Sequence, residues 1–352
     1  MTAIYSIPQT ISTRYAFRSK PVNARAIKAV IPTCSDWDGL KITLDSLLNL
    51  KTPPKKIAVA NDNKESGTPA WLAHYPVEVI DYPGNVGPAR ARNRGFGLRE
   101  GELGDNSLGA IVEAITRKKG FPSYVRNGFC AELKYQKEYR VPDLFTWESE
   151  IDWCYFTDCG CTHDPGLFLN FEKSWRENGD SCVAISGPIT GSGSGLINEY
   201  MTEQGILNPP LEKTVHGIYV PQAIVTANAL IAGLPFAYLG GFDPTFSEAA
   251  GEDLDLGIRL REFGVIAWCD DARVAHRFDE NESDFYKRFR RYGRGNRKLE
   301  MKHGLPCLRA RSFKAEKPDL QRLADMSVDA MQAGYDEAID HSLRGTLRRL
   351  DE

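Results

Sequence analysis

The 352-residue sequence has no apolar run near the roughly 20 residues that a transmembrane helix needs, and its N-terminus has no signal-peptide apolar core. These absences predict a soluble, cytoplasmic protein. The sequence also has no large excess of either charge, because it contains 44 basic and 47 acidic residues and its net charge is -3. A general polyanion binder is therefore not indicated. The sequence shows no internal repeat.

Paired cysteines at metal-binding spacing are missing as well. None of the eight cysteines forms a C-x-x-C pair, which argues against a zinc site of familiar type. Several lie in apolar runs such as WCYF and SCVAIS, where a free cysteine behaves as a small hydrophobe. We therefore expect mostly buried free thiols.

Short apolar, β-branched runs alternate with helix-like stretches from about residue 28 onward. The runs lie at 28–33, 57–62, 77–82, 152–158 and 182–189. This alternation predicts an α/β fold with a Rossmann-like, mostly parallel sheet that helices cover on both faces. Ligands of such sheets bind beyond the carboxyl ends of the strands. The polar groups at these ends are Thr33, Asp62, the loop 84–94 and Asp158.

Two regions depart from this alternation. Residues 99–150 are polar and weakly periodic, with one credible helix at Ser107 to Lys119, and we interpret them as an insertion. Residues 286–302 carry eight basic residues against one acidic, and the glycines at 292–295 would let the chain bend over a ligand. A helical, amphipathic stretch follows from about residue 314. The predicted division is an N-terminal extension (1–27), a sheet domain (28–285) and a basic, helical C-terminal region (286–352).

The stretch 240–264 is the most informative part of the chain. Gly251 precedes Glu252 and Asp253 at the start of an amphipathic helix. Acidic residues in a first helical turn interact favourably with the helix dipole, which is a purely structural interpretation. The same dipole keeps a carboxylate ionised near neutral pH, as a general base requires.

Six short motifs follow one another in a characteristic order: I-P-T, N-D, G-N-x-G-x-x-x-A-R-N, T-D-x-x-C, G-G-F-D and G-E-D-L-D-L. In this order the chain resembles the inverting family-2 glycosyltransferases of GT-A fold, over about residues 29–297 without the insertion. The resemblance implies transfer of a sugar, with inversion, from a nucleotide diphosphate donor to an acceptor nucleophile. A UDP-linked donor is the first expectation.

The resemblance also implies roles for particular residues. Asp253 matches the catalytic base, and Glu252 is the neighbouring acid that orients it. Asp62 would accept the imide N–H of a uracil-like base, and Asn93 would fix its loop. The implied donor-binding residues are Pro32, Thr33, Asp62, Gly87, Arg90, Asn93 and Asp158.

The implied metal site departs from the family pattern. Asp158 and His276 match ligands of a divalent ion, Mn²⁺ or Mg²⁺, but Gly160 stands where relatives carry the second acid of D-x-D. His163 and Asp164 are alternative ligands. Metal dependence stays open on this basis.

The basic segment after His276 offers a second way to stabilise the departing diphosphate. Guanidinium groups form bidentate bonds to phosphate oxygens, so we expect Arg291 and Arg294 to contact the donor. A solvated basic helix or a peripheral contact with an anionic membrane is the alternative. A nucleic-acid groove is disfavoured because the basic run is short.

Two other functions stay open. The first is a nucleotide-sugar-binding protein that is catalytically impaired, as Gly160 suggests. The second is a nucleotidyltransferase, although the expected Gly-rich loop is replaced by PTCSDWDG. The sequence identifies neither the sugar nor the acceptor, which could be a peptide, a small molecule or a lipid-linked glycan.

Overall fold

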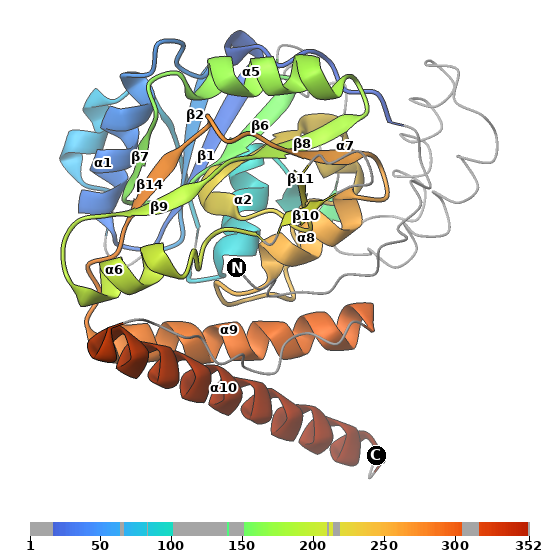
Figure 1. Cartoon of the computed structure of the whole chain (residues 1–352). Coiled ribbons are helices and arrows are strands. Elements are labelled where there is room, and N and C mark those ends of the chain that lie inside the picture. Colours follow the sequence, from blue (N-terminus) through green and yellow to red (C-terminus); the bar gives the residue numbers. More distant parts are fainter. Residues whose placement is uncertain are drawn as a thin grey trace.

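The computed structural model describes residues 17–63, 67–82, 84–100, 139–140, 151–209, 211–213, 219–304 and 317–350. Its centre is a seven-stranded sheet with the order β13-β8-β12-β6-β1-β2-β3 (Figure 1). The strands are β1 (Ile27–Thr33), β2 (Lys56–Asn61), β3 (Glu78–Asp81), β6 (Trp153–Phe156), β8 (Cys182–Ser186), β12 (Ala229–Ala232) and β13 (Val265–Trp268). All neighbours run parallel except β12, which is antiparallel to both β6 and β8. The predicted mostly parallel α/β sheet is confirmed.

Helices cover both faces of this sheet. The helices are α1 (Trp37–Leu48), α2 (Pro88–Phe96), α5 (Leu167–Asn178), α6 (Leu196–Glu203), α7 (Gly233–Tyr238), α8 (Glu252–Leu260), α9 (Glu282–His303) and α10 (Pro318–Leu350). Of these, α6, α9 and α10 pack with one another in a separate apolar cluster. Apolar side chains of α1 and α5 form one core with the sheet. Those of α2, α7 and α8 form a second core on the opposite face. In β1, Ile31 packs in the first core and Val30 in the second, which is why the strand is apolar at consecutive positions.

Several short elements complete the fold. A second sheet joins β7 (Cys161–His163), β14 (Val274–Arg277) and β9 (Ile189–Ser192). Two further pairs are β4 (Arg99–Glu100) with β5 (Tyr139–Arg140), and β10 (Leu211–Lys213) with β11 (Tyr219–Pro221). Short 3-10 turns lie at Ala24–Ala26, Ala70–His74 and Thr226–Asn228. The helix predicted at Ser107 to Lys119 lies outside the described residues, as does most of the predicted insertion.

The apolar run at 182–189 was predicted to be one strand, and this is wrong. The chain leaves β8 after Ser186 and enters the second sheet at Ile189. Gly187 lies at the junction, where a Cβ atom would be 2.0 Å from the Ala272 carbonyl oxygen. The close approach of two backbones therefore divides one apolar run between two sheets.

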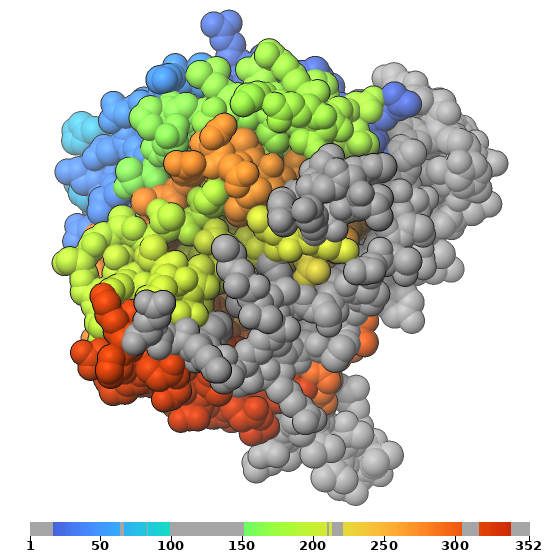
Figure 2. Space-filling model, viewed as in Figure 1, coloured from blue at the N-terminus to red at the C-terminus, as the bar shows by residue number. Residues whose placement is uncertain are grey.

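The predicted helical C-terminal region is confirmed, but the predicted bend at 292–295 is wrong. Helix α9 runs unbroken from Glu282 to His303 and packs against α10 on one side of the sheet domain (Figure 1). The red surface of α10 lies along that side in Figure 2. A Cβ on Gly293 would lie 2.0 Å from the Met331 carbonyl oxygen, and one on Gly295 would lie 2.6 Å from that of Ala250. These glycines serve close backbone packing rather than bending.

The cysteine prediction is largely confirmed. All six described cysteines are free, and four of them are buried (Cys154, Cys161, Cys182 and Cys269). Cys34 is exposed, while Cys130 and Cys307 lie outside the described residues. None of the helices in the described part of the chain combines the length and apolar composition that a bilayer crossing requires.

Candidate active site

A cavity of about 180 Å³ lies where the sheet domain meets the two C-terminal helices. Side chains from α2, the end of β6, β14 and the start of α8 contribute five of its polar lining residues. These polar residues are Arg92, Asp158, Glu252, Asp253 and His276. The cavity therefore brings together two motifs that are far apart in the sequence, T-D at 157–158 and G-E-D at 251–253.

Arg92 joins these two motifs. Its guanidinium donates to the Asp158 carboxylate at 2.7 Å and to the Glu252 carboxylate at 2.8 Å. Arg92 and Glu252 are both buried, and each carboxylate raises the pKa of the guanidinium. The sequence analysis chose Arg90 and missed Arg92. The buried positions of α2 include Ala89, Arg92, Asn93 and Phe96, an i, i+3, i+4, i+7 pattern that indicates which arginine faces inward.

Asp253 lies in the first turn of α8, two residues after Gly251, which has a left-handed conformation. One carboxylate oxygen accepts the backbone N–H of Leu254 at 2.8 Å. Burial, followed by the neighbouring Glu252 carboxylate, raises the pKa of Asp253 to about 7, and Arg92 opposes this shift. A carboxyl group with a pKa near 7 is well matched to general-base catalysis at neutral pH.

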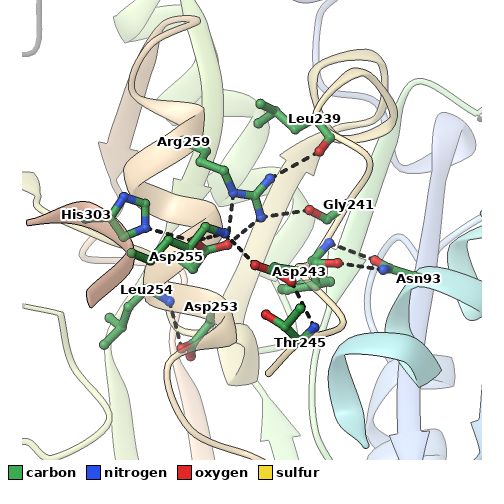
Figure 3. Close-up of polar contacts among 12 residues, drawn as sticks. Asn93, Leu239, Gly241, Asp243, Thr245, Asp253, Leu254, Asp255, Arg259 and His303 are labelled. Carbon is green, nitrogen blue, oxygen red and sulfur yellow. Dashed lines mark hydrogen bonds and ion pairs between the residues drawn. The ribbon is translucent and has the colours of Figure 1, made fainter. Parts of the chain in front are cut away.

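Asp255 lies two residues further along α8 and anchors the helix (Figure 3). Its carboxylate accepts from Arg259 at 2.7 Å, from Lys302 at 2.6 Å and from His303 at 2.8 Å. These donors hold the pKa of the fully buried Asp255 well below its ordinary value, against the effect of burial. Arg259 also donates to the carbonyls of Leu239 and Gly241, so α8, α9 and the G-G-F-D loop form one unit. The sequence analysis gave Asp255 no role.

Asn93 was predicted to fix its own loop, but its side chain binds a different loop. Its side-chain amide donates to the Phe242 carbonyl and accepts from the Phe242 N–H, both at 2.8 Å. Figure 3 shows Asn93 close to the loop that contains Gly241 and Asp243. The amide therefore ties α2 to the G-G-F-D loop, which brings Arg92 toward the start of α8.

Asp62 also holds a loop in place. Its two carboxylate oxygens accept the N–H groups of Val86 and Gly87, each at 2.8 Å. Gly87 has φ +91°, and a Cβ there would lie 2.2 Å from the Ser247 carbonyl oxygen. The contact predicted between Asp62 and a nucleotide base stays a prediction. The predicted donor-binding residues outside the cavity lining are Pro32, Thr33, Asp62, Gly87, Arg90 and Asn93.

Asp158 and His276 meet part of the requirement for a metal site. His276 Nδ1 is buried and has no hydrogen-bond partner among the described residues, and burial lowers the pKa of the ring. A neutral imidazole is the form that binds metals. Within the described residues, however, no group of three or more His, Cys, Asp or Glu side chains could hold an ion. The two residues fit an ion only if its further ligands come from outside the described residues, such as the phosphates of a donor.

The other ligand alternatives are not supported. His163 contacts Ser46 through Nδ1 and Thr157 through Nε2, both at 3.0 Å, and burial lowers its pKa to about 3. Asp164 accepts the N–H of Gly166 in a turn. Gly160 has φ +80°, so an acid there would be strained as well as close to Arg277. His163 is a structural residue of the core, contrary to the alternative raised from the sequence.

The two arginines predicted to contact phosphate lie in different surroundings. Arg291 lines the cavity, and its buried Nε has no hydrogen-bond partner among the described residues. Arg294 donates instead to Glu248 at 2.7 Å and to Glu337 at 3.2 Å. Arg291 is therefore the better candidate for binding an anion in the cavity.

The solved structures to which the chain is similar have low sequence identity to it. A mannosyltransferase, PcManGT of Pyrobaculum calidifontis, in complex with GDP-Man and Mn²⁺, is 10% identical, with a TM-score of 0.49 over 96% of this chain and 84% of its own. GalNAc-T7 with UDP, GalNAc and Mn²⁺ is 13% identical, with a TM-score of 0.45 over 92% of this chain and 58% of its own. S. aureus TarS is 12% identical, with a TM-score of 0.42 over 76% of this chain and 39% of its own.

A comparison with curated protein sequences finds no significant match. The family comparison is informative for the first part of the sheet domain. Residues 28–103, which include β1, β2, β3 and α2, match the model of glycosyl transferase family 2. This segment contains three of the six motifs on which the resemblance was based. Residues 28–103 are therefore similar to glycosyl transferase family 2, the family that the motifs of the chain resemble.

Proposed function

We propose that the protein is an inverting glycosyltransferase that moves a sugar from a nucleotide diphosphate donor, UDP-linked in the first instance, to an acceptor nucleophile. The observation that carries this proposal is Asp253, a carboxyl group with a pKa near 7 in a cavity with Asp158 and His276. The match of residues 28–103 to glycosyl transferase family 2 supports the type of reaction.

The proposed step is a single displacement. An acceptor hydroxyl beside Asp253 attacks the anomeric carbon of the donor sugar, and the bond from that carbon to the diphosphate oxygen breaks. The hydroxyl proton passes to the Asp253 carboxylate, and the leaving diphosphate retains the electron pair of the broken bond. Attack from the face opposite the leaving group inverts the anomeric centre. Glu252 is bound to Arg92, so its role is to hold the start of α8 rather than to accept the proton.

The remaining predicted contacts belong to the donor. We propose that Thr33, Asp62 and Arg90 bind the nucleoside, with Asp62 also holding the loop at 86–87. Asp158 and His276 would hold a divalent ion together with the phosphates of the donor. Such an ion neutralises developing charge on the leaving group. Arg291 would supply a further positive charge to the same group.

Two alternatives receive less support. A binding protein has no need of a general base. A buried carboxyl group costs stability when it is ionised, so its presence in the cavity favours a catalytic role. Contact of α9 with an anionic membrane is also less favoured, because acidic side chains pair with its arginines. These pairs are Arg288 with Glu280, Arg290 with Glu337, and Arg294 with Glu248.

The proposal also keeps the division of the chain that the sequence predicts, with a sheet domain at 28–285 between an N-terminal extension and a C-terminal region.

The proposal is tested by incubating the protein with a panel of nucleotide sugars and measuring slow hydrolysis of each donor. One donor should be hydrolysed faster than the others, and Asp253→Asn should abolish this activity. The same assay with Mn²⁺ and with excess chelator tests the metal. Since the described residues supply two of the proposed ligands and no group of three, we expect weak metal binding and partial retention of activity in chelator. Absence of turnover with every donor would contradict the proposal.

A further inference from the structure

Glu252 and Asp253 are neighbours at the start of α8, and both line the same cavity. Their hydrogen-bond donors differ. The Glu252 carboxylate accepts from the Arg92 guanidinium at 2.8 Å, whereas the Asp253 carboxylate accepts from the backbone N–H of Leu254 at 2.8 Å. Arg92 acts on Asp253 by charge attraction over a longer distance. Arg92 therefore makes two neighbouring carboxyl groups chemically unequal.

The Arg92 guanidinium is held in place on several sides. While Nη1 donates to Glu252, Nη2 donates to Asp158 at 2.7 Å, and the side chain is buried. Its Cζ atom also lies 5.7 Å from the centroid of the Phe242 ring. The guanidinium would have to give up a hydrogen bond to a buried or partly buried carboxylate in order to approach Asp253. Its preference for Glu252 is therefore built into the packing of α2.

We propose that Arg92 is a positioning residue that selects the base: by binding Glu252, it leaves Asp253 as the carboxylate that receives the acceptor proton. This inference rests on the proposed glycosyl transfer. In that step the acceptor oxygen bonds to the anomeric carbon, its proton moves to Asp253, and the diphosphate leaves with the electron pair of the broken bond. A carboxylate that is bound to a guanidinium loses part of that attraction when it is protonated, so Glu252 is the poorer acceptor of the two.

The other charged side chains of the cavity come from the end of β6, from β14 and from α9. They are Asp158, His276, Arg288 and Arg291. Arg288 donates to Glu280 at 2.9 Å, so its charge is already paired. Burial and then Glu252 raise the pKa of Asp253, and Arg92 is the cation that most lowers it. Burial also raises the pKa of Glu252, and Arg92 opposes that rise. Without Arg92, two like-charged carboxylates would stand side by side, and the pair would hold its first proton to a higher pH.

NMR of the full-length protein, labelled with ¹³C at the side-chain carboxyl groups, follows both protons without any donor. The two signals are identified by their absence from Asp253→Asn and Glu252→Gln. In the wild type we expect Asp253 to titrate near pH 7 and Glu252 to titrate at a lower pH. In Arg92→Met both should titrate together, and the first proton should be held to a pH higher by about 1 unit.

Three further variants sharpen this test. Arg92→Lys keeps the positive charge and should return the titration of Asp253 toward that of the wild type. Arg94→Met, on the same helix but with an exposed side chain, is the matched control and should leave it unchanged. In Glu252→Gln the titration of Asp253 should move to lower pH, because the neighbouring negative charge is lost; this result is informative even if Arg92→Met does not fold. Thermal unfolding of each variant checks its folding.

The pH dependence of kcat/KM separates selection of the base from a purely structural role. In Arg92→Met the acidic limb should move to higher pH, and Arg92→Lys should restore it, whereas a structural defect would lower the rate equally at every pH. A loss of rate that does not depend on pH, or the same Asp253 and Glu252 titrations in the wild type and Arg92→Met, would overturn the assignment. If the titrations behave as expected while no donor is turned over, the proposed reaction fails and the division of protons by Arg92 stands.

Discussion

Asp253 and Asp255 lie two residues apart in the first turn of the same helix (Figure 3). Their surroundings nevertheless shift the pKa values of the two carboxyl groups in opposite directions. The pKa of Asp253 is raised to about 7 by burial and by Glu252. The pKa of Asp255 is lowered well below its ordinary value because Arg259, Lys302 and His303 surround its carboxylate. Both groups share one helix dipole, so the dipole does not explain the difference.

The cationic partners explain it. Arg259, Lys302 and His303 contact Asp255 directly, whereas Arg92 forms its ion pairs with Asp158 and Glu252 and acts on Asp253 only from a greater distance. A carboxylate that is fully paired holds a helix in place but accepts protons poorly. A carboxylate left without a direct cationic partner can accept a proton near neutral pH. One helical turn thus carries both an anchor and a candidate base.

The largest expected effect is on turnover in Asp253→Asn. The amide has nearly the same shape but cannot accept a proton, so the rate should fall by about 10²–10⁴-fold. Donor binding should change little, because the proton is transferred only in the reaction. Steady-state rates with the active donor, together with calorimetric donor binding, provide the measurement. Wild-type turnover in this variant would show that Asp253 is not the base.

Asp255→Asn should act on stability instead. Removing one partner from a buried, paired cluster costs about 3–5 kcal/mol, and denaturant unfolding at pH 7 measures it. The folded-state pKa of Asp255 is depressed, so its contribution is present above the pKa of the unfolded chain and is lost as the pH falls below it. The difference between wild type and variant should therefore shrink in acid. Asp253→Asn is the matched control and should not lower stability at pH 7.

Arg291→Ala should lower turnover by about 10–100-fold, the loss expected for one hydrogen bond to a charged group at roughly 1.5–3 kcal/mol. Arg294→Ala is the control on the same helix. Its guanidinium is already paired with Glu248 and Glu337, so its removal should leave turnover nearly unchanged. Rate measurements on both variants decide the point. Equal losses in the two would refute the distinction between them.

Gly293→Ala should have the smallest effect of the series, at about 1–3 kcal/mol of destabilisation from overpacking. The added methyl group would lie 2.0 Å from the Met331 carbonyl oxygen and push α9 and α10 apart. Thermal unfolding gives the shift. Gly304→Ala separates crowding from backbone strain, because Gly304 has open space around its Cβ position but a positive φ of 63°. A fully stable Gly293→Ala protein would show that the glycine is not needed for close packing.

Much of the sheet was predictable because its strands are short apolar runs buried on both faces, and turn residues separate them. The positions of Asp158 and Asp253 in one cavity followed from the strand-end rule and from the order of the motifs. Other features depend on tertiary contacts. Gly293 and Gly295 look like flexible points until the neighbouring backbone is seen. Local sequence also does not show that Arg92 binds Asp158 and Glu252, or that Arg294 meets two carboxylates.

The pH dependence of kcat/KM with the active donor, in the wild type and in Asp253→Asn, tests the central claim most directly. If Asp253 is the base, the wild-type rate should fall in acid with a midpoint near pH 7, because the carboxylate must be ionised to accept the proton. The variant should keep only a low residual rate without that acidic limb. An unchanged limb in Asp253→Asn, or a wild-type rate that stays level from about pH 5 to about pH 9, would contradict the assignment.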